Sequence, residues 1–274
     1  MIGIPYDSAD RPGTETLGKV VIKIPQLSAV AADMPMKAPP MPVEPVYNWT
    51  GFYIGGNVGG GWDDIKTLEL APGTAAFPTG TVFPTARGSG WLGGVQAGYN
   101  WQAAPNFLVG LEGEFSWADI TDTSNSVSTV PRFLGLTSTT HTKLKDFALG
   151  TARLGYVSSN WLFYGKAGVA WGETTSNGFS TLADGTPDGT YNRFASRAGW
   201  VVGAGVEWGF ASNWSARIEY DHIFFDSRTI QSNNFSTAGV LTNSFISSGV
   251  NVDIVRAGLN YRFNWGAAPL LAKY

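Results

Sequence analysis

The sequence predicts an all-β protein, an eight-stranded antiparallel up-and-down transmembrane β-barrel with a disordered N-terminal segment. Three observations carry this prediction. Segments in which apolar and polar residues alternate recur eight times between residues 49 and 263. The connections between these segments alternate between short and long. Tryptophan residues gather at the ends of the segments rather than in their middles.

The composition fits a sheet with one lipid-facing side and one polar side. Charged residues make up only 14% of the chain, against roughly 25% in soluble domains, and 11 residues are Trp. The mean hydropathy is nevertheless −0.03, because the two faces cancel. The chain has no apolar run of the ~18 residues that a membrane-spanning helix needs. A net charge of −3 and the absence of basic runs argue against nucleic acid as a partner, and the absence of Cys excludes thiolate chemistry.

The N-terminal part differs from the rest of the chain. Residues 1–32 are leader-like, with small residues that suit signal-peptidase cleavage after Ala31 or Ala32. The apolar stretch before them is interrupted by Lys23, so a wrongly assigned translation start or a disrupted leader is the favoured interpretation. A disordered cytosolic tail is the alternative. Residues 33–48 form a Pro-rich linker, residues 49–263 the barrel, and residues 264–274 a C-terminal tail.

Period-two alternation defines the strands in order. The predicted strands are residues 50–61, 89–102, 107–117, 144–156, 161–172, 197–210, 214–221 and 254–263. In the third strand, apolar side chains occupy the odd positions, whereas Glu112 and Glu114 occupy even ones. The fourth strand is the least regular, because Phe147 and Leu149 fall on the same parity as Arg153.

The connections favour an up-and-down order of strands. Short turns are predicted at residues 103–106, 157–160 and 211–213. Long polar loops are predicted at residues 63–87, 119–141, 173–193 and 227–249. Strict alternation of this kind is typical of outer-membrane barrels, which have short periplasmic turns and longer external loops.

The tryptophans predict two girdles at the membrane interfaces, where an amphipathic ring is most stable. The predicted girdle residues are Trp49, Trp62, Trp91, Trp101, Trp117, Trp161, Trp171, Trp208, Trp214 and Trp265.

Four segments, residues 47–57, 94–101, 152–156 and 257–263, resemble the small outer-membrane immunogenic proteins. These are porin-family, eight-stranded outer-membrane β-barrels of Gram-negative bacteria. The resemblance implies a surface antigen in the cell outer membrane, exported with a signal peptide and folded by the outer-membrane assembly machinery. Leu259, Tyr261 and Phe263 look like the alternating signal that this machinery reads, although eleven residues follow them.

The inward face of the predicted barrel carries charges of both signs. They are Glu112, Glu114, Arg153, Lys166, Glu207, Arg217, Glu219, Asp221, Arg256 and Arg262. An eight-stranded barrel is just wide enough for its own side chains, and a lone buried charge is costly. These residues therefore predict a lumen that is closed by paired charges. The alternative is a narrow ion-conducting porin lined by the same residues.

No catalytic, metal or cofactor site is predicted. The sequence has only two histidines, His141 and His222, and neither has a nucleophile and an orienting acid at recognisable spacing. An outer-membrane hydrolase and a soluble lipocalin-like binding barrel are the less favoured alternatives. The external loops, rich in Ser, Thr, Asn and Gly, suit surface recognition of a host or small-molecule ligand. Haem, a phage or a host surface is suggested by the family resemblance alone.

Overall fold

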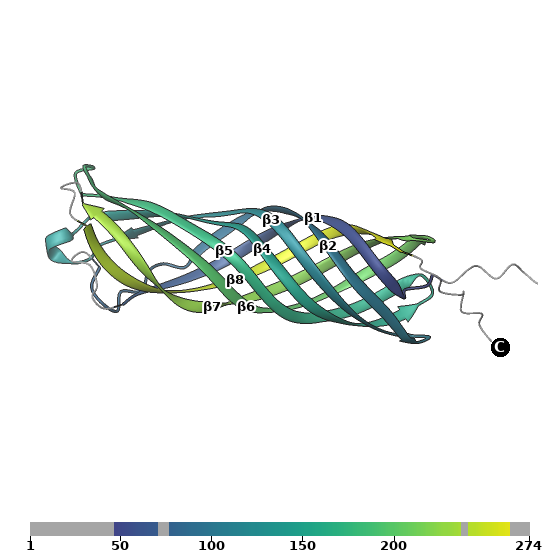
Figure 1. The fold of residues 1–274 in the computed structure, drawn as a ribbon. Helices are drawn as coiled ribbons and strands as arrows, with labels where there is room; N and C mark the ends of the chain where they lie inside the picture. The colour runs from purple at the N-terminus through teal and green to yellow at the C-terminus, as the bar shows by residue number, and fades with distance from the viewer. Residues whose placement is uncertain (1–46, 71–76, 237–240, 264–274) are drawn as a thin grey trace, which may run out of the picture. The chain divides into compact units, whose positions relative to one another are not determined.

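The structure is a computed structural model that describes residues 47–70, 77–236 and 241–263. The predictions for residues 1–46 and 264–274 lie outside this range. The described part is almost entirely β-structure (Figure 1). Its strands are β1 (Gly51–Glu69), β2 (Ala86–Ala104), β3 (Phe107–Val127), β4 (Thr137–Ser158), β5 (Trp161–Thr181), β6 (Pro187–Ala211), β7 (Trp214–Ser236) and β8 (Leu241–Arg262). No helix among the described residues is long and apolar enough to cross a membrane.

The eight strands form a closed ring in which each strand is antiparallel to the next. β8 completes the ring by pairing with β1, from Tyr53 opposite Arg262 to Glu69 opposite Ile246. The predicted fold class, strand number and strand order are therefore confirmed. The short connections between β2 and β3, β4 and β5, and β6 and β7 all lie at one end of the barrel (Figure 1).

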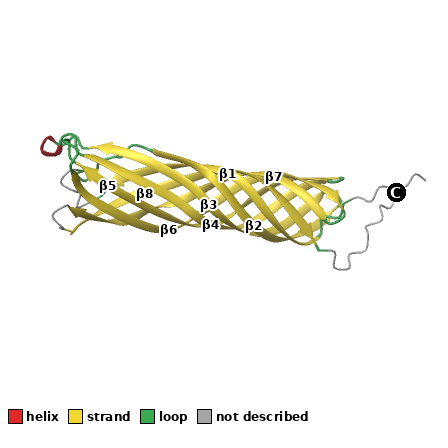
Figure 2. Cartoon of the chain, turned by 90° about the horizontal axis from the view of Figure 1, so that it is seen from above, coloured by secondary structure: helices red, strands yellow, loops and turns green. Residues whose placement is uncertain are grey.

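The strands are longer than the sequence predicts, at 19 to 25 residues each. Of the segments predicted as long loops, residues 119–141, 173–193 and the described part of 227–249 are largely strand, and residues 63–87 are strand at both ends, so the predicted loop bounds were wrong. These segments are rich in Ser and Thr. Such polar residues are compatible with hydrogen-bonded strands where the outer face of the sheet is in contact with water. The described connections at this end include a short 3₁₀ helix, η1 (Pro131–Phe133), which Figure 2 shows at the tip.

Side chains alternate between the interior and the exterior of the barrel. The outward positions hold large apolar residues such as Leu111, which is 68% exposed. A β-bulge between Leu144 and Asp146 shifts the parity of β4, so that Leu144 and Phe147 both face the interior. The irregular β4 pattern thus has a structural origin: its inward face is partly apolar.

Two rows of outward tryptophans bound the apolar exterior. The inner row, beside the short turns, consists of Trp101, Trp161, Trp208 and Trp214. The outer row consists of Trp62, Trp91, Trp117, Trp171 and Trp200. On β2, β5 and β6, which carry a Trp in both rows, the two are about eight to ten residues apart, which matches the ~25 Å apolar band of a membrane barrel. The strands continue well beyond the outer row.

Candidate functional site

The interior between the two tryptophan rows holds a group of nine charged side chains, which we call the central charge cluster. Its members come from β3 to β8, and their side chains are at most 3% exposed. They are Glu112, Glu114, Arg153, Lys166, Glu207, Arg217, Glu219, Asp221 and Arg256. The structure therefore brings together all the predicted lumen charges except Arg262.

Each cation of the cluster contacts more than one carboxylate. The Lys166 Nζ lies 2.5 Å from Glu114 Oε1 and 2.7 Å from Glu219 Oε1. The Arg256 guanidinium contacts Asp221 and Glu114, and its Nε lies 3.0 Å from Glu219 Oε1. Shared contacts of this kind offset the desolvation cost of burying the charges.

Arg153, another cation of the central charge cluster, contacts two tyrosines as well as carboxylates. Its guanidinium donates to Glu207 at 2.9 Å and to the Tyr53 hydroxyl at 2.7 Å. Tyr53 in turn donates to Glu112 Oε2 at 2.7 Å, and Tyr164 donates to Glu219 Oε2 at the same distance. The Arg153 guanidinium also lies 4.0 Å from the centre of the Tyr164 ring.

The sequence reasoning missed these two tyrosines. Each lies directly across from a glycine in the neighbouring strand, Tyr53 from Gly98 and Tyr164 from Gly205. A Cβ at Gly98 would lie 2.4 Å from the Tyr53 hydroxyl oxygen, and one at Gly205 would lie 2.5 Å from that of Tyr164. The inward position of Tyr164 could have been predicted from the sequence. It lies two residues from Lys166, so the two side chains point to the same face of the strand.

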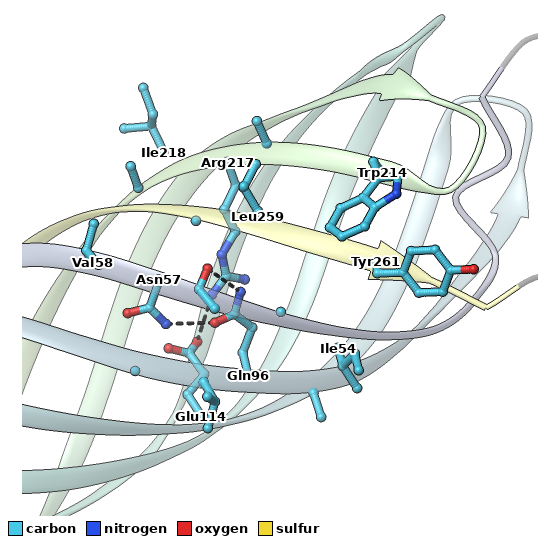
Figure 3. Close-up of a pocket in the computed structure, with 18 of the residues that line it drawn as sticks. Ile54, Asn57, Val58, Gln96, Glu114, Trp214, Arg217, Ile218, Leu259 and Tyr261 are labelled. Atoms are coloured by element: carbon cyan, nitrogen blue, oxygen red, sulfur yellow. Dashed lines mark hydrogen bonds and ion pairs between the residues drawn. The ribbon is translucent and has the colours of Figure 1, made fainter.

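A chain of neutral side chains continues the network along β1, β2 and β8. Asn57 donates to Gln96 at 2.7 Å, Gln96 to Asn260 at 2.8 Å, and Asn260 to Glu207 at 2.8 Å. Ser215 donates to the same Glu207 oxygen. Figure 3 shows Asn57 and Gln96 on the inner side of the wall. These hydrogen bonds join the neutral side chains of β1, β2, β7 and β8 to the central charge cluster.

An apolar layer lies next to the charge cluster, on the side away from the short turns. Every strand contributes to it, and its members are at most 8% exposed. They are Ile65, Ala86, Leu92, Ile120, Leu144, Phe147, Leu149, Ala170, Val201, Ile223, Phe225, Val250, Val252 and Ile254. The sequence analysis did not predict this layer, because it assumed that inward positions would be polar.

The end of the interior beside the short turns contains the residues that precede β1. Trp49 is 1% exposed and packs with Tyr47, Leu108 and Leu162. The prediction that Trp49 belongs to a membrane-interface girdle was therefore wrong. The chain turns into the barrel mouth here, where the Tyr47 N–H donates to the Asn160 side chain at 3.2 Å. Trp265 lies outside the described residues.

Arg262 lies at the same end rather than in the central charge cluster. It donates to the backbone carbonyls of Thr50 and Ser212, and its guanidinium lies 5.0 Å from the Tyr47 ring centre. Its predicted place among the paired lumen charges therefore needs correction. Position 262 is the last residue of β8, so its side chain meets the segment before β1 and the turn between β6 and β7.

Beyond the outer tryptophan row the interior becomes polar again. Burial raises the pKa of Asp63 to about 6, and the neighbouring Asp122 charge adds to this effect. The Gly88 amide opposes it by donating to Asp63 Oδ1 at 2.7 Å. Burial also lowers the pKa of Arg197 to about 10, and this side chain donates to the Ser248 carbonyl at 2.7 Å.

The cluster contains three carboxylates, those of Glu112, Glu114 and Glu219, with oxygens within 4.8 Å of one another. Lys166 contacts all three of them. A positive side chain thus already occupies the position that a metal ion would take, so the donor set fits an ion-pair network better than a metal site.

The two histidines lie on the exterior. His141 is exposed and contacts the Thr123 hydroxyl. His222 faces outward on β7 and contacts Asp253 of β8. Neither shares the barrel interior with the central charge cluster.

The comparisons with known proteins agree with this geometry. Residues 27–263 match the family model described as the outer membrane protein beta-barrel domain. The 31 kDa outer-membrane immunogenic protein of Brucella melitensis is 34% identical over 86% of this chain and 94% of its own length. The 22 kDa outer membrane protein of Rhizobium leguminosarum is 26% identical, covering 81% of this chain and 82% of its own. Among solved structures, the outer membrane protease OmpT from Escherichia coli has a TM-score of 0.51 at 11% identity, covering 79% of this chain and 98% of its own. That likeness shows the fold alone.

Proposed function

The chain belongs to the outer membrane protein beta-barrel domain family and is an outer-membrane protein, and from this premise we propose that it is a closed barrel with a structural and surface-interaction role. In this proposal the lumen does not conduct, and the part of the barrel beyond the outer tryptophan row provides the recognition surface. The central charge cluster is the observation that carries the proposal.

Two features of the interior support a closed lumen. The cations and carboxylates of the cluster contact one another directly, at distances such as 2.9 Å between Arg153 and Glu207. An ion that passed through would have to break these pairs, and each broken pair leaves a buried charge at a cost of about 3–5 kcal/mol. It would then meet the apolar layer, where it would lose its water with no polar group to replace it.

The length of the strands supports a surface role. The ladders of β3 and β4 continue for about ten residues beyond the outer tryptophan row, with exposed polar residues such as Asn125 and Thr123. A rigid, polar projection suits contact with another molecule outside the cell. The recognition surface for a host or small-molecule ligand would then be the outer half of the barrel and its tips, rather than long flexible loops.

The last strand suits recognition by the assembly machinery. Leu259 and Tyr261 face outward on β8, and the Tyr261 ring lies 5.2 Å from that of Phe263. An exposed row of alternating apolar and aromatic side chains at the end of the barrel can be read before the barrel enters the membrane. We propose that these three residues are this protein's assembly signal.

A narrow ion-conducting porin is the second candidate. The hollow in Figure 3 favours it, because its lining includes the inward polar residues Asn57, Gln96 and Arg217 along a wall rich in glycine. The hydrogen bonds among these residues and the apolar layer oppose it.

A hydrolytic function has less support. A hydrolase would need a base near a nucleophile in a water-accessible site. His141 contacts the Thr123 hydroxyl and His222 contacts the Asp253 carboxylate, so among the described residues neither histidine contacts both a hydroxyl nucleophile and an orienting acid. We therefore propose a role without catalysis.

Single-channel recording distinguishes the two main candidates. Residues 33–274, refolded and inserted into a planar lipid bilayer, should give a silent membrane, with insertion confirmed by a heat-dependent shift in gel mobility. Discrete, reproducible conductance steps from the unmodified protein would overturn the closed-lumen proposal. The Phe147→Ser and Leu149→Ser double variant is the matched control, because it places two hydroxyls in the fourteen-residue apolar layer and substitutes no member of the central charge cluster.

A further inference from the structure

The outward face of the barrel carries an unusual polar pair at the level of the outer tryptophan row. Asp253 lies directly across from Trp62 in the neighbouring strand, and His222 lies directly across from Asp253. From this level to the inner tryptophan row, the outward positions of β7 and β8 are all apolar or aromatic. The pair is thus a polar patch at the edge of an apolar face, at the interface level where the head groups of lipids lie.

The pair has a defined geometry. Asp253 Oδ1 accepts from His222 Nδ1 at 2.6 Å and from the Tyr220 hydroxyl at 2.5 Å. Because a carboxylate only accepts, Nδ1 must carry a hydrogen, and Nε2 is the second polar atom of the ring. The side chains of His222 and Asp253 remain 24% and 22% exposed, so a molecule in the membrane can reach them.

Aromatic rings surround this pair. The rings of His222 and Phe224 have their centres 4.2 Å apart. Trp62, Tyr220 and Phe224 are between 43% and 46% exposed. A carboxylate flanked by aromatic faces suits a sugar, whose hydroxyls form hydrogen bonds while its C–H groups pack on the rings.

An apolar groove lies on the same strands, on the periplasmic side of the pair. Its floor is made of small residues, Gly56, Ala216 and Ala257. Its sides are apolar, and Figure 3 shows Ile54, Val58, Ile218 and Leu259 around it, with Trp214 and Tyr261 toward the inner row. The hollow to which these residues belong continues over the other strands, and the groove is the part of it on β1, β7 and β8.

We propose that the groove and the pair of His222 and Asp253 form a binding site for one outer-leaflet glycolipid. A hydroxyl or amide of its sugar head group bonds to His222 Nε2 and to the Asp253 carboxylate, and one acyl chain lies along Ala216 and Ala257. The pair holds one acid and one base, so it suits a neutral polar group better than a phosphate. The site rests on the outer-membrane location, and it is independent of whether the lumen conducts.

Lipid binding by the refolded full-length protein tests this proposal. The protein in detergent micelles is titrated with purified lipid A, and bound lipid is counted by native mass spectrometry. We expect saturable binding of one molecule, about tenfold weaker in His222→Ala and in Asp253→Asn. Phosphatidylethanolamine, which has no sugar, should bind more weakly than lipid A to the unmodified protein and equally to all variants.

Two further variants separate the groove from general effects on the barrel. Ala257→Phe places a ring in the groove without touching the polar pair, and it should weaken lipid A binding. Ala167→Phe adds the same ring to the outward face of β5, and it should not. Equal lipid A binding by the unmodified protein, His222→Ala and Ala257→Phe, all with normal heat-dependent gel mobility, would overturn the proposal. Self-association in lipid-free micelles that is lost in His222→Ala would also overturn it, because the pair would then be a contact between protein copies.

Discussion

At the scale of single residues, the stability of the barrel depends on ion pairs that are fully buried. Arg153 contacts Glu112 and Glu207, and its side chain is 0% exposed. Replacing it by Met removes the cation that contacts Glu207 and one of the cations that contact Glu112, in a place that water does not reach. We expect Arg153→Met to lower the free energy of unfolding by about 3–5 kcal/mol. Urea unfolding in micelles, followed by tryptophan fluorescence, measures this loss.

An exposed ion pair provides the control for that measurement. Lys143 and Asp119 lie 2.6 Å apart, but their side chains are 43% and 55% exposed. Lys143→Met should therefore cost less than about 1 kcal/mol, because water replaces the lost partner. If the two substitutions cost the same, the central charge cluster does not behave as a buried network.

The alternation of apolar and polar residues predicted most members of the central charge cluster. A charge on the polar face of an alternating strand, such as Glu112, has only the interior to face. The misplaced residues lie at strand ends, where alternation no longer determines direction. Trp49 precedes β1 and turns into the barrel mouth, and Arg262 ends β8 beside it. Their positions depend on how the chain enters the barrel, which a period of two does not encode.

At the scale of the strands, glycines determine which side chains the interior can hold. Gly98 of β2 lies under the Tyr53 ring of β1, and an added Cβ would also come within 2.6 Å of the Leu111 carbonyl oxygen. Gly98→Ala should therefore displace Tyr53 from Glu112 and cost about 1–3 kcal/mol. Gly113 of β3 faces outward, and the nearest atom to its added Cβ is 4.0 Å away. Gly113→Ala should leave the urea midpoint almost unchanged, and a loss equal to that of Gly98→Ala would contradict this explanation.

The strand ends were predicted less well than the strand cores. Between the two tryptophan rows the outward residues of β3 are apolar or glycine, so the pattern is unambiguous between Phe107 and Trp117. Beyond the outer tryptophan row both faces meet polar surroundings, and the alternation fades even though the hydrogen-bonded ladder continues to Val127. Sequence reasoning therefore predicted loops where the structure has strands.

At the scale of the whole barrel, the long strands place about half of the ladder outside the membrane. The chain contains no Cys, so a single introduced cysteine can be labelled without background. Asn125 and Leu111 both face outward on β3, Asn125 beyond the outer tryptophan row and Leu111 between the rows. In intact cells, a membrane-impermeant maleimide should label Asn125→Cys rapidly and Leu111→Cys hardly at all.

Detergent extraction supplies the control for the labelling experiment. Both cysteines should react once the lipid is removed, because Leu111 is 68% exposed on the protein surface. Protection of Asn125→Cys in cells but not in detergent would mean that the outer half of the ladder is embedded, and the surface role proposed above would lose its support.

The pairing of β1 with β8 also determines the order of events as the chain folds. Hairpins between consecutive strands can form early, because their residues are close in the chain. The last seam joins Tyr53 to Arg262, near the two ends of the described chain, so it forms late. Until then two strands carry unpaired N–H and C=O groups, which lipid cannot satisfy and which another chain could capture. The half-finished barrel is thus the vulnerable species, and the time spent with an open seam is what an assembly factor must shorten.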